Sequence, residues 1–105
     1  MEHKTFAVDF DGTLCENEWP EIGKPYTDTI EHMKRLRKKG HKIILWTCRE
    51  GDDLIKAITW CAEQELFFDA VNDNLEENKK FFGGNSRKIV ADFYIDDRAL
   101  RTLPI

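Results

Sequence analysis

The chain of 105 residues is about the length of one domain, and we treat residues 1–105 as a single domain. Twenty acidic against 16 basic residues give a net charge of −4, which disfavours a protein that binds nucleic acid mainly through a basic surface. A hydrophobic content of 41% excludes general disorder.

The first half of the chain alternates between strand-like and helix-like patterns. A short apolar run at 5–8 predicts a buried strand. Residues 27–39 have the apolar spacing of a helix, with Asp28 and Glu31 placed as a capping box and Gly40 as the stop signal. The apolar run 42–46 predicts a second strand, covered on both faces.

The second half repeats this alternation less regularly. Residues 52–65 predict a second helix, and 67–71 predict a third strand. Residues 72–87 form a long polar stretch in which we expect a short helix at 75–81. A fourth strand is expected at 93–95. The order of elements predicts an α/β fold with a mainly parallel sheet flanked by helices.

Polar residues follow three of the expected strands at their carboxyl ends. They are Asp9 to Thr13 after the first strand, Thr47 to Arg49 after the second, and Asp96 with Asp97 after the fourth. Ligands of parallel α/β sheets bind at these strand ends, so we expect the three groups to share one site.

The carboxylates in these groups predict a metal site. Asp9 and Asp11 lie two residues apart, so both side chains can face the shared site at the strand ends. Gly12 permits a tight turn after them. Four carboxylates, with Asp96 and Asp97, would repel one another unless they hold a cation. Hard oxygen ligands in incomplete number suit Mg2+ better than zinc. A carboxylate beside Mg2+ can attack phosphorus and form an aspartyl-phosphate.

These groups also resemble the motifs of a known family. Residues 9–14 (Asp-Phe-Asp-Gly-Thr-Leu), following an apolar strand, resemble the first motif of the haloacid dehalogenase superfamily phosphatases. Thr47 matches the second motif, and residues 95–98 (Ile-Asp-Asp-Arg) match the fourth. The resemblance covers nearly the whole chain in the family's order and implies a Rossmann-like core.

The resemblance assigns roles to individual residues. Asp9 would be the nucleophile, and Asp11 would protonate the leaving oxygen and later deprotonate water. Thr47 would donate a hydrogen bond to the phosphate. Asp9, the backbone carbonyl of Asp11 and Asp96 would hold Mg2+, and Asp97 would support them through a water or a hydrogen bond. An acid at position 11 implies a phosphatase or phosphotransferase, because dehalogenases and P-type pumps of the superfamily lack it.

The family's third motif is a lysine that neutralises phosphate charge. Residues 91–98 resemble the deoxyribonucleotidase branch, whose lysine lies close to the last strand, and this favours Lys88 as a catalytic and substrate-binding residue. The more common upstream position favours Lys79 or Lys80 instead, and a chain without this lysine is the remaining alternative.

A second local resemblance concerns residues 47–50 (Thr-Cys-Arg-Glu), which are similar to a Ser-Gly-Arg-Glu stretch in the phosphatase domain of polynucleotide kinases. Arg49 would then either bind substrate phosphate or pair with Glu50 or a loop carboxylate. With Thr47 and Lys88, Arg49 and Cys48 complete the candidate substrate-binding residues. For Cys48, a small packed residue is the alternative.

The space between the motifs predicts an open site. Residues 14–26 provide a flap containing Trp19 and Gly23 rather than a cap domain. We expect the partner to be a phosphorylated small molecule or a nucleotide; the net charge does not support nucleic acid, and a homo-oligomer stays open. The alternatives are a phosphatase specific for nucleotides or nucleic-acid ends, and a non-catalytic, receiver-like module that senses phosphate or metal.

The cellular context is predicted from three cysteines, which form no CxxC pair and favour a reducing cytoplasm over a disulfide framework. The N-terminus lacks the apolar region of a signal peptide. No apolar run approaches the roughly 20 residues of a membrane span. We therefore expect a cytoplasmic protein that does not enter the membrane.

Overall fold

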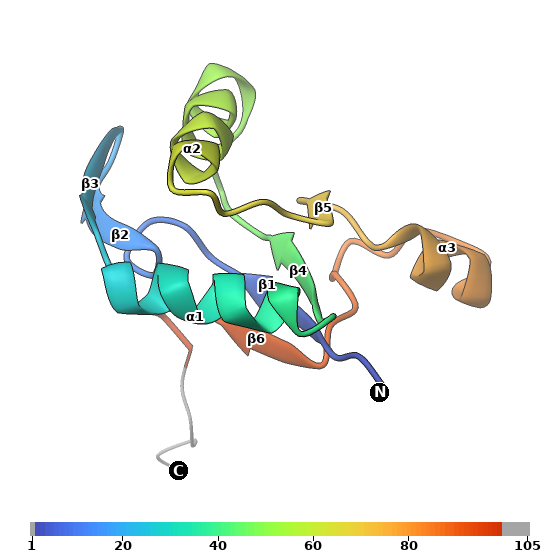
Figure 1. Cartoon of the computed structure of the whole chain (residues 1–105). Coiled ribbons are helices and arrows are strands. Elements are labelled where there is room, and N and C mark those ends of the chain that lie inside the picture. Colours follow the sequence, from blue (N-terminus) through green and yellow to red (C-terminus); the bar gives the residue numbers. More distant parts are fainter. Residues whose placement is uncertain (1, 100–105) are drawn as a thin grey trace, which may run out of the picture.

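The computed structural model describes residues 2–99 and is built around a four-stranded parallel sheet (Figure 1). The strands lie in the order β5-β4-β1-β6 and are β5 (Ala70–Val71), β4 (Lys42–Leu45), β1 (Thr5–Val8) and β6 (Phe93–Ile95). Val8 is level with Leu45 on one side and Ile95 on the other. The residues that follow β1, β4 and β6 therefore emerge at one edge of the sheet.

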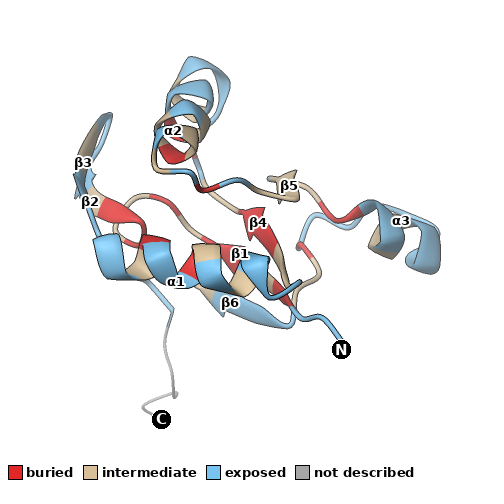
Figure 2. Cartoon of the chain, in the orientation of Figure 1, coloured by how far each residue is buried: buried red, intermediate tan, exposed pale blue. Residues whose placement is uncertain are grey.

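One face of the sheet is covered by α1 (Thr27–Lys38) and α2 (Gly51–Glu63). Each helix buries one apolar stripe, because its apolar residues recur every three or four positions. Figure 2 shows the buried residues concentrated on β1, β4 and the inner sides of these helices. The buried core on this face includes Ile30 and Met33 of α1, Ala57 and Cys61 of α2, and Val8, Ile43 and Leu45 of the sheet.

The other face is covered by the loops around α3 (Glu76–Phe82) rather than by α3 itself, which has no buried residue. Leu75 and Ile89 pack against Ala7 and Ile44 there. The loops are held by Asn74, which is 4% exposed and whose Oδ1 accepts a hydrogen bond from the Val90 amide at 2.7 Å. This arrangement gives the second face a thin covering.

A β-hairpin follows β1 in the region where the sequence predicts a flap. It consists of β2 (Cys15–Glu18) and β3 (Glu21–Pro25), paired antiparallel, and we call it the flap hairpin. A Cβ at Gly23 would lie 2.4 Å from the carbonyl oxygen of Glu16, so the close approach of the two strands requires glycine. Within residues 2–99 no cap domain is inserted, as expected.

The element predictions agree with the structure except in detail. The capping box is wrong: α1 begins after Tyr26, and no side chain caps it. Gly40 ends α1 with φ +95°, as expected. The strand predicted at 67–71 is reduced to Ala70–Val71, and Phe67 is 51% exposed. None of the helices in residues 2–99 has the length and apolar character needed to cross a membrane.

Candidate active site

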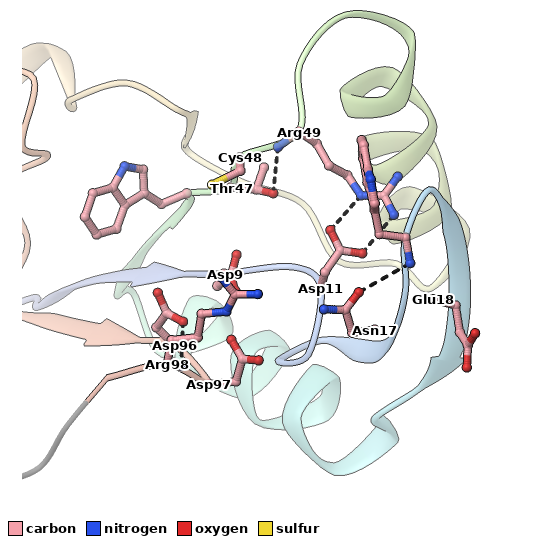
Figure 3. Close-up of a pocket in the computed structure, with 12 residues that line it drawn as sticks. Asp9, Asp11, Asn17, Glu18, Thr47, Cys48, Arg49, Asp96, Asp97 and Arg98 are labelled. Carbon is pink, nitrogen blue, oxygen red and sulfur yellow. Dashed lines mark hydrogen bonds and ion pairs between the residues drawn. The ribbon is translucent and has the colours of Figure 1, made fainter.

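A cavity of about 760 Å3 opens where β1, β4 and β6 end. Figure 3 shows the side chains around it. Acids gather on the side of β1 and β6, and Arg49 faces Asp11 on the side of the flap hairpin. The lining residues are Asp9, Asp11, Asn17, Glu18, Trp19, Trp46, Thr47, Cys48, Arg49, Asp96, Asp97 and Arg98. The three polar groups predicted from the sequence thus line one cavity, although the lysines do not.

Three of the predicted carboxylates converge. Asp9, Asp96 and Asp97 each offer an oxygen, and these oxygens all lie within 4.8 Å of one another. The Asp9 amide donates to the carbonyl of Ile95 at 2.9 Å, which fixes the end of β1 against β6. The Arg98 amide donates to Asp96 Oδ1 at 2.9 Å and orients that carboxylate.

Gly12 makes room for this cluster. Its φ is +84°, in the region that favours glycine, and a Cβ built on it would lie 2.2 Å from Asp97 Oδ2. The glycine of the Asp-Phe-Asp-Gly-Thr motif therefore serves two purposes. It turns the chain after β1, and it lets the carboxylate of Asp97 approach the backbone of that turn.

The electrostatics of the cluster suit a divalent cation. The pKa of Asp9 is raised from 3.8 to about 6, first by burial and then by the negative charges of Asp96, Asp97 and Asp11. A cation held by the converging oxygens would offset this repulsion, and three carboxylates are hard ligands of the kind Mg2+ prefers. The residues present fit the predicted metal.

The loop after β4 is held by a residue that the sequence did not single out. Asn72 accepts a hydrogen bond from the Thr47 amide at 2.8 Å and donates to the Arg49 carbonyl at 3.4 Å. The Thr47 hydroxyl in turn accepts a bond from the Arg49 amide at 3.2 Å. Asn72 has φ +49°, a conformation that asparagine tolerates better than most residues. The sequence feature that could have indicated this role is the position of Asn72 directly after the predicted third strand.

Arg49 forms an ion pair with Asp11. Its Nε and Nη2 each donate to one carboxylate oxygen of Asp11 at 2.8 Å, and the side chain is only 1% exposed. This is the pairing with a loop carboxylate that the sequence left open beside phosphate binding. The bond to Asp11 raises the pKa of Arg49 above its ordinary value. A direct contact of Arg49 with substrate stays a prediction.

None of the three lysine candidates, Lys88, Lys79 and Lys80, lines the cavity. Lys88 Nζ lies 5.6 Å from the centre of the Tyr94 ring, and Tyr94 packs against Trp46, which does line the cavity. Lys79 Nζ is bound to Asp73 at 2.7 Å and to Glu76 at 3.1 Å. The role of Lys88 as the third-motif lysine stays a prediction.

Other lining residues were not assigned from the sequence. Asn17 and Glu18 reach the cavity from the flap hairpin, and Arg98 reaches it from the end of β6. Trp19, which the sequence places in the flap, lines the cavity and is 55% exposed. Arg98 directly follows the acidic pair of the fourth motif, so its place at the cavity could have been predicted from the sequence.

The chain is similar to two known proteins. No family model matches the chain. Over 51 residues, 49% of the chain, it is 43% identical to a phosphoglycolate phosphatase of Nitrosopumilus maritimus strain SCM1, and the match covers 21% of that protein. The solved structure of a conserved protein from Bacteroides thetaiotaomicron is 41% identical and has a TM-score of 0.85, over 99% of this chain and 84% of that one.

Phosphoglycolate phosphatase is a member of the superfamily that the motifs resemble. This partial match supports the resemblance of the chain to the haloacid dehalogenase superfamily. Its central parallel sheet, flanking helices and lack of a cap within residues 2–99 confirm the fold expected for a small haloacid dehalogenase core. The match spans about a fifth of the length of that phosphatase.

Proposed function

We propose that this chain is a Mg2+-dependent phosphomonoester hydrolase that works through an aspartyl-phosphate on Asp9. The observation that carries the proposal is the convergence of Asp9, Asp96 and Asp97. One oxygen from each lies within 4.8 Å of the others, and all three residues line a cavity of about 760 Å3. Crowded carboxylates of this kind are compatible when a hard cation lies among them. The name of the phosphatase relative supports the same class of reaction.

The proposed reaction has two steps. In the first, a carboxylate oxygen of Asp9 attacks phosphorus, the bond from phosphorus to the leaving oxygen breaks, and Asp11 gives that oxygen a proton. In the second, water attacks phosphorus, Asp11 takes the proton from the water, and the acyl phosphate bond breaks. The products are inorganic phosphate and the original Asp9.

The residues around Asp9 have separate proposed roles in binding Mg2+ and phosphate. Asp96 and Asp97 would hold Mg2+ together with Asp9 and the carbonyl of Asp11. When bound, Mg2+ would neutralise the carboxylates and polarise a phosphate oxygen. Thr47, at the end of β4, would donate its hydroxyl to the phosphate.

The expected substrate is a phosphorylated small molecule or a nucleotide. The cavity has the volume of a small-molecule site, and no cap domain covers it within residues 2–99. Phosphoglycolate belongs on a substrate panel because of the relative's name. Nucleotides and nucleic-acid ends belong there because of the local motif resemblances. A receiver-like sensor gains no support from a relative that is named a phosphatase.

The proposal is tested with p-nitrophenyl phosphate, first with Mg2+ and then with EDTA. The wild type should turn over with Mg2+ and stop in EDTA. Asp9→Asn should lose at least about 1,000-fold in kcat/KM, as expected for loss of a nucleophile. Asp28→Asn, an exposed aspartate on α1, is the matched control and should behave as wild type.

Two results would overturn the proposal. The first is turnover that survives in Asp9→Asn. The second is a wild type that hydrolyses nothing in a panel of phosphoglycolate, sugar phosphates, nucleoside monophosphates and phosphorylated oligonucleotide ends. Acid quenching during turnover, followed by mass spectrometry, should find phosphate on the peptide that contains Asp9.

A further inference from the structure

The guanidinium of Arg49 has an acceptor for every hydrogen it can donate. An arginine side chain carries five N–H groups. Two of them bind the two carboxylate oxygens of Asp11 at 2.8 Å. The other three bind backbone carbonyls, those of Glu21 at 3.1 Å, Pro20 at 3.2 Å and Asp53 at 3.5 Å. All five donors are therefore used within the chain.

These acceptors come from three separate parts of the fold. Asp11 lies in the motif loop after β1, Pro20 and Glu21 form the tip of the flap hairpin, and Asp53 lies in the first turn of α2. Aromatic rings cover the guanidinium as well, with its carbon 5.1 Å from the centre of the Phe10 ring and 4.9 Å from that of Trp19. Figure 3 shows Asp11 facing this guanidinium rather than the acids at the ends of β1 and β6.

A buried ion pair of this kind is by itself weak evidence for a stabilising role. A buried ion pair costs desolvation that its attraction only partly offsets, and an apolar replacement of similar volume is often as stable. What the arrangement supplies is geometry, because a bidentate pair fixes the plane of the carboxylate. The carboxylate it fixes is the one that the proposed mechanism uses for proton transfer.

We propose that Arg49 is a positioning residue that holds Asp11 and the tip of the flap hairpin as one unit over the cavity. The inference rests on the proposed function, since it concerns the efficiency of Asp11 as general acid. A carboxylate has about four lone-pair positions, so a bidentate pair leaves acceptor capacity for the leaving oxygen. Arg49 acts through Asp11, and phosphate does not need to touch it.

The experiment compares two aryl phosphates that differ in their need for a proton. Phenyl phosphate releases a basic phenolate and depends on a general acid, whereas p-nitrophenyl phosphate releases a stable anion. Arg49→Lys should lower kcat/KM about 10- to 100-fold on phenyl phosphate and less than about 3-fold on p-nitrophenyl phosphate. The parameter kcat/KM is chosen because it includes departure of the leaving group.

The ratio of the two activities separates positioning from folding. Both substrates are measured on one preparation, so a smaller folded fraction lowers both activities equally and leaves the ratio unchanged. Asp11→Asn gives the reference ratio for a lost general acid. The double variant with Arg49→Lys should be no slower than Asp11→Asn alone, because residues that act as a unit are not additive. Arg37→Lys, which alters an Arg–Asp pair with Asp69 outside the cavity, is the matched control.

The hairpin part of the inference has its own readout. Amides of residues 15–25 should exchange with solvent faster in Arg49→Lys than in wild type. An unchanged activity ratio, an additive double variant or unchanged hairpin exchange would overturn the inference while leaving hydrolysis by Asp9 intact. A wild type that hydrolyses neither ester would instead overturn the proposed function, and this inference with it.

Discussion

Asp9 and Asp73 both lie where the chain leaves the parallel sheet, one after β1 and the other two residues after β5, and their surroundings are opposite. Asp9 lies among Asp96 and Asp97, and its pKa is raised to about 6 by burial and by these charges. Asp73 accepts hydrogen bonds from Lys79 at 2.7 Å and Asn85 at 3.0 Å, and its pKa is lowered by them. The negative charge of Asp73 is therefore neutralised within the chain, whereas that of Asp9 is available to bind a cation.

This difference separates structural charge from chemical charge. Asp73 has its partners in α3 (Lys79) and in the loop after α3 (Asn85), and these bonds help to fix that segment. The acids at the ends of β1 and β6 have no cation of the chain bound to them among residues 2–99. Uncompensated charge costs stability, and functional sites are where proteins retain such costs. Four changes, from the largest expected effect to the smallest, test the contrast.

The largest effect is expected from Gly12→Ala. The added Cβ would lie 2.2 Å from Asp97 Oδ2 at a φ of +84°, so it should displace the acidic cluster. We expect about 2 kcal/mol of destabilisation and at least about a 100-fold loss of kcat/KM. Gly40→Ala has a similar φ of +95° and nothing within 4 Å, so it should lose stability but keep activity. Equal activity losses in the two variants would contradict this account.

The next effect is stabilisation by Mg2+. At 100 times its Kd a ligand adds about 2.7 kcal/mol to the free energy of unfolding, or roughly 10–20 °C in Tm for a domain of this size. Thermal scans with and without Mg2+ should show this shift in the wild type and in Asp73→Asn. Asp96→Asn should lose it. A shift of equal size in Asp96→Asn would place the ion elsewhere.

The third effect is the pH dependence of the metal-free protein. The pKa of Asp9 is higher in the folded chain, about 6, than its ordinary value of 3.8. Its contribution to stability is therefore complete below pH 3.8 and is lost as the pH rises through 6. In EDTA at pH 7, Asp9→Asn should be more stable than wild type by about 1 kcal/mol, after allowance for partial exposure. Tm measured between pH 4 and pH 7 should fall more steeply in the wild type than in the variant.

The smallest effect should have the opposite sign. The lowered pKa of Asp73 means that its contribution is present above pH 3.8 and is lost as the pH falls below that value. Asp73→Asn should thus lower Tm slightly at pH 7, and the difference should shrink in high salt because the pair with Lys79 is exposed. A variant more stable than wild type at pH 7 would remove the contrast with Asp9.

The sequence predicted most of the sheet and both larger helices because their apolar periods are clear. The flap hairpin could not be assigned as strands, since β2 reads Cys-Glu-Asn-Glu and lacks alternation. The capping box failed because a Ser, Thr, Asp or Asn spacing does not decide which residue begins a helix. The strand at 67–71 was too long because Phe67, although β-prone, pairs with no neighbour in the sheet.

The site was predictable to the extent that strand ends determine it. Asp9, Asp96 and Asp97 come together because β1 and β6 are adjacent and in register. The sequence predicted that the strand ends share one edge of the sheet, but it did not predict that these two strands are neighbours. The pairing of Arg49 with Asp11 was only one of several partners that the sequence allowed. Asn72 was missed because its role depends on a left-handed backbone conformation and on a hydrogen bond across 25 positions of the chain.

β6 is three residues long, and within residues 2–99 it lies at the edge of the four-stranded sheet and pairs with β1 alone. Two of the three converging acids directly follow it. Short edge strands open locally at a small fraction of the free energy that unfolds a whole domain. We therefore expect Phe93–Ile95 to detach from β1 more often than the whole chain unfolds, and each detachment would separate Asp96 and Asp97 from Asp9. Amide protons of β6 should accordingly exchange before those of β4, which is paired on both sides.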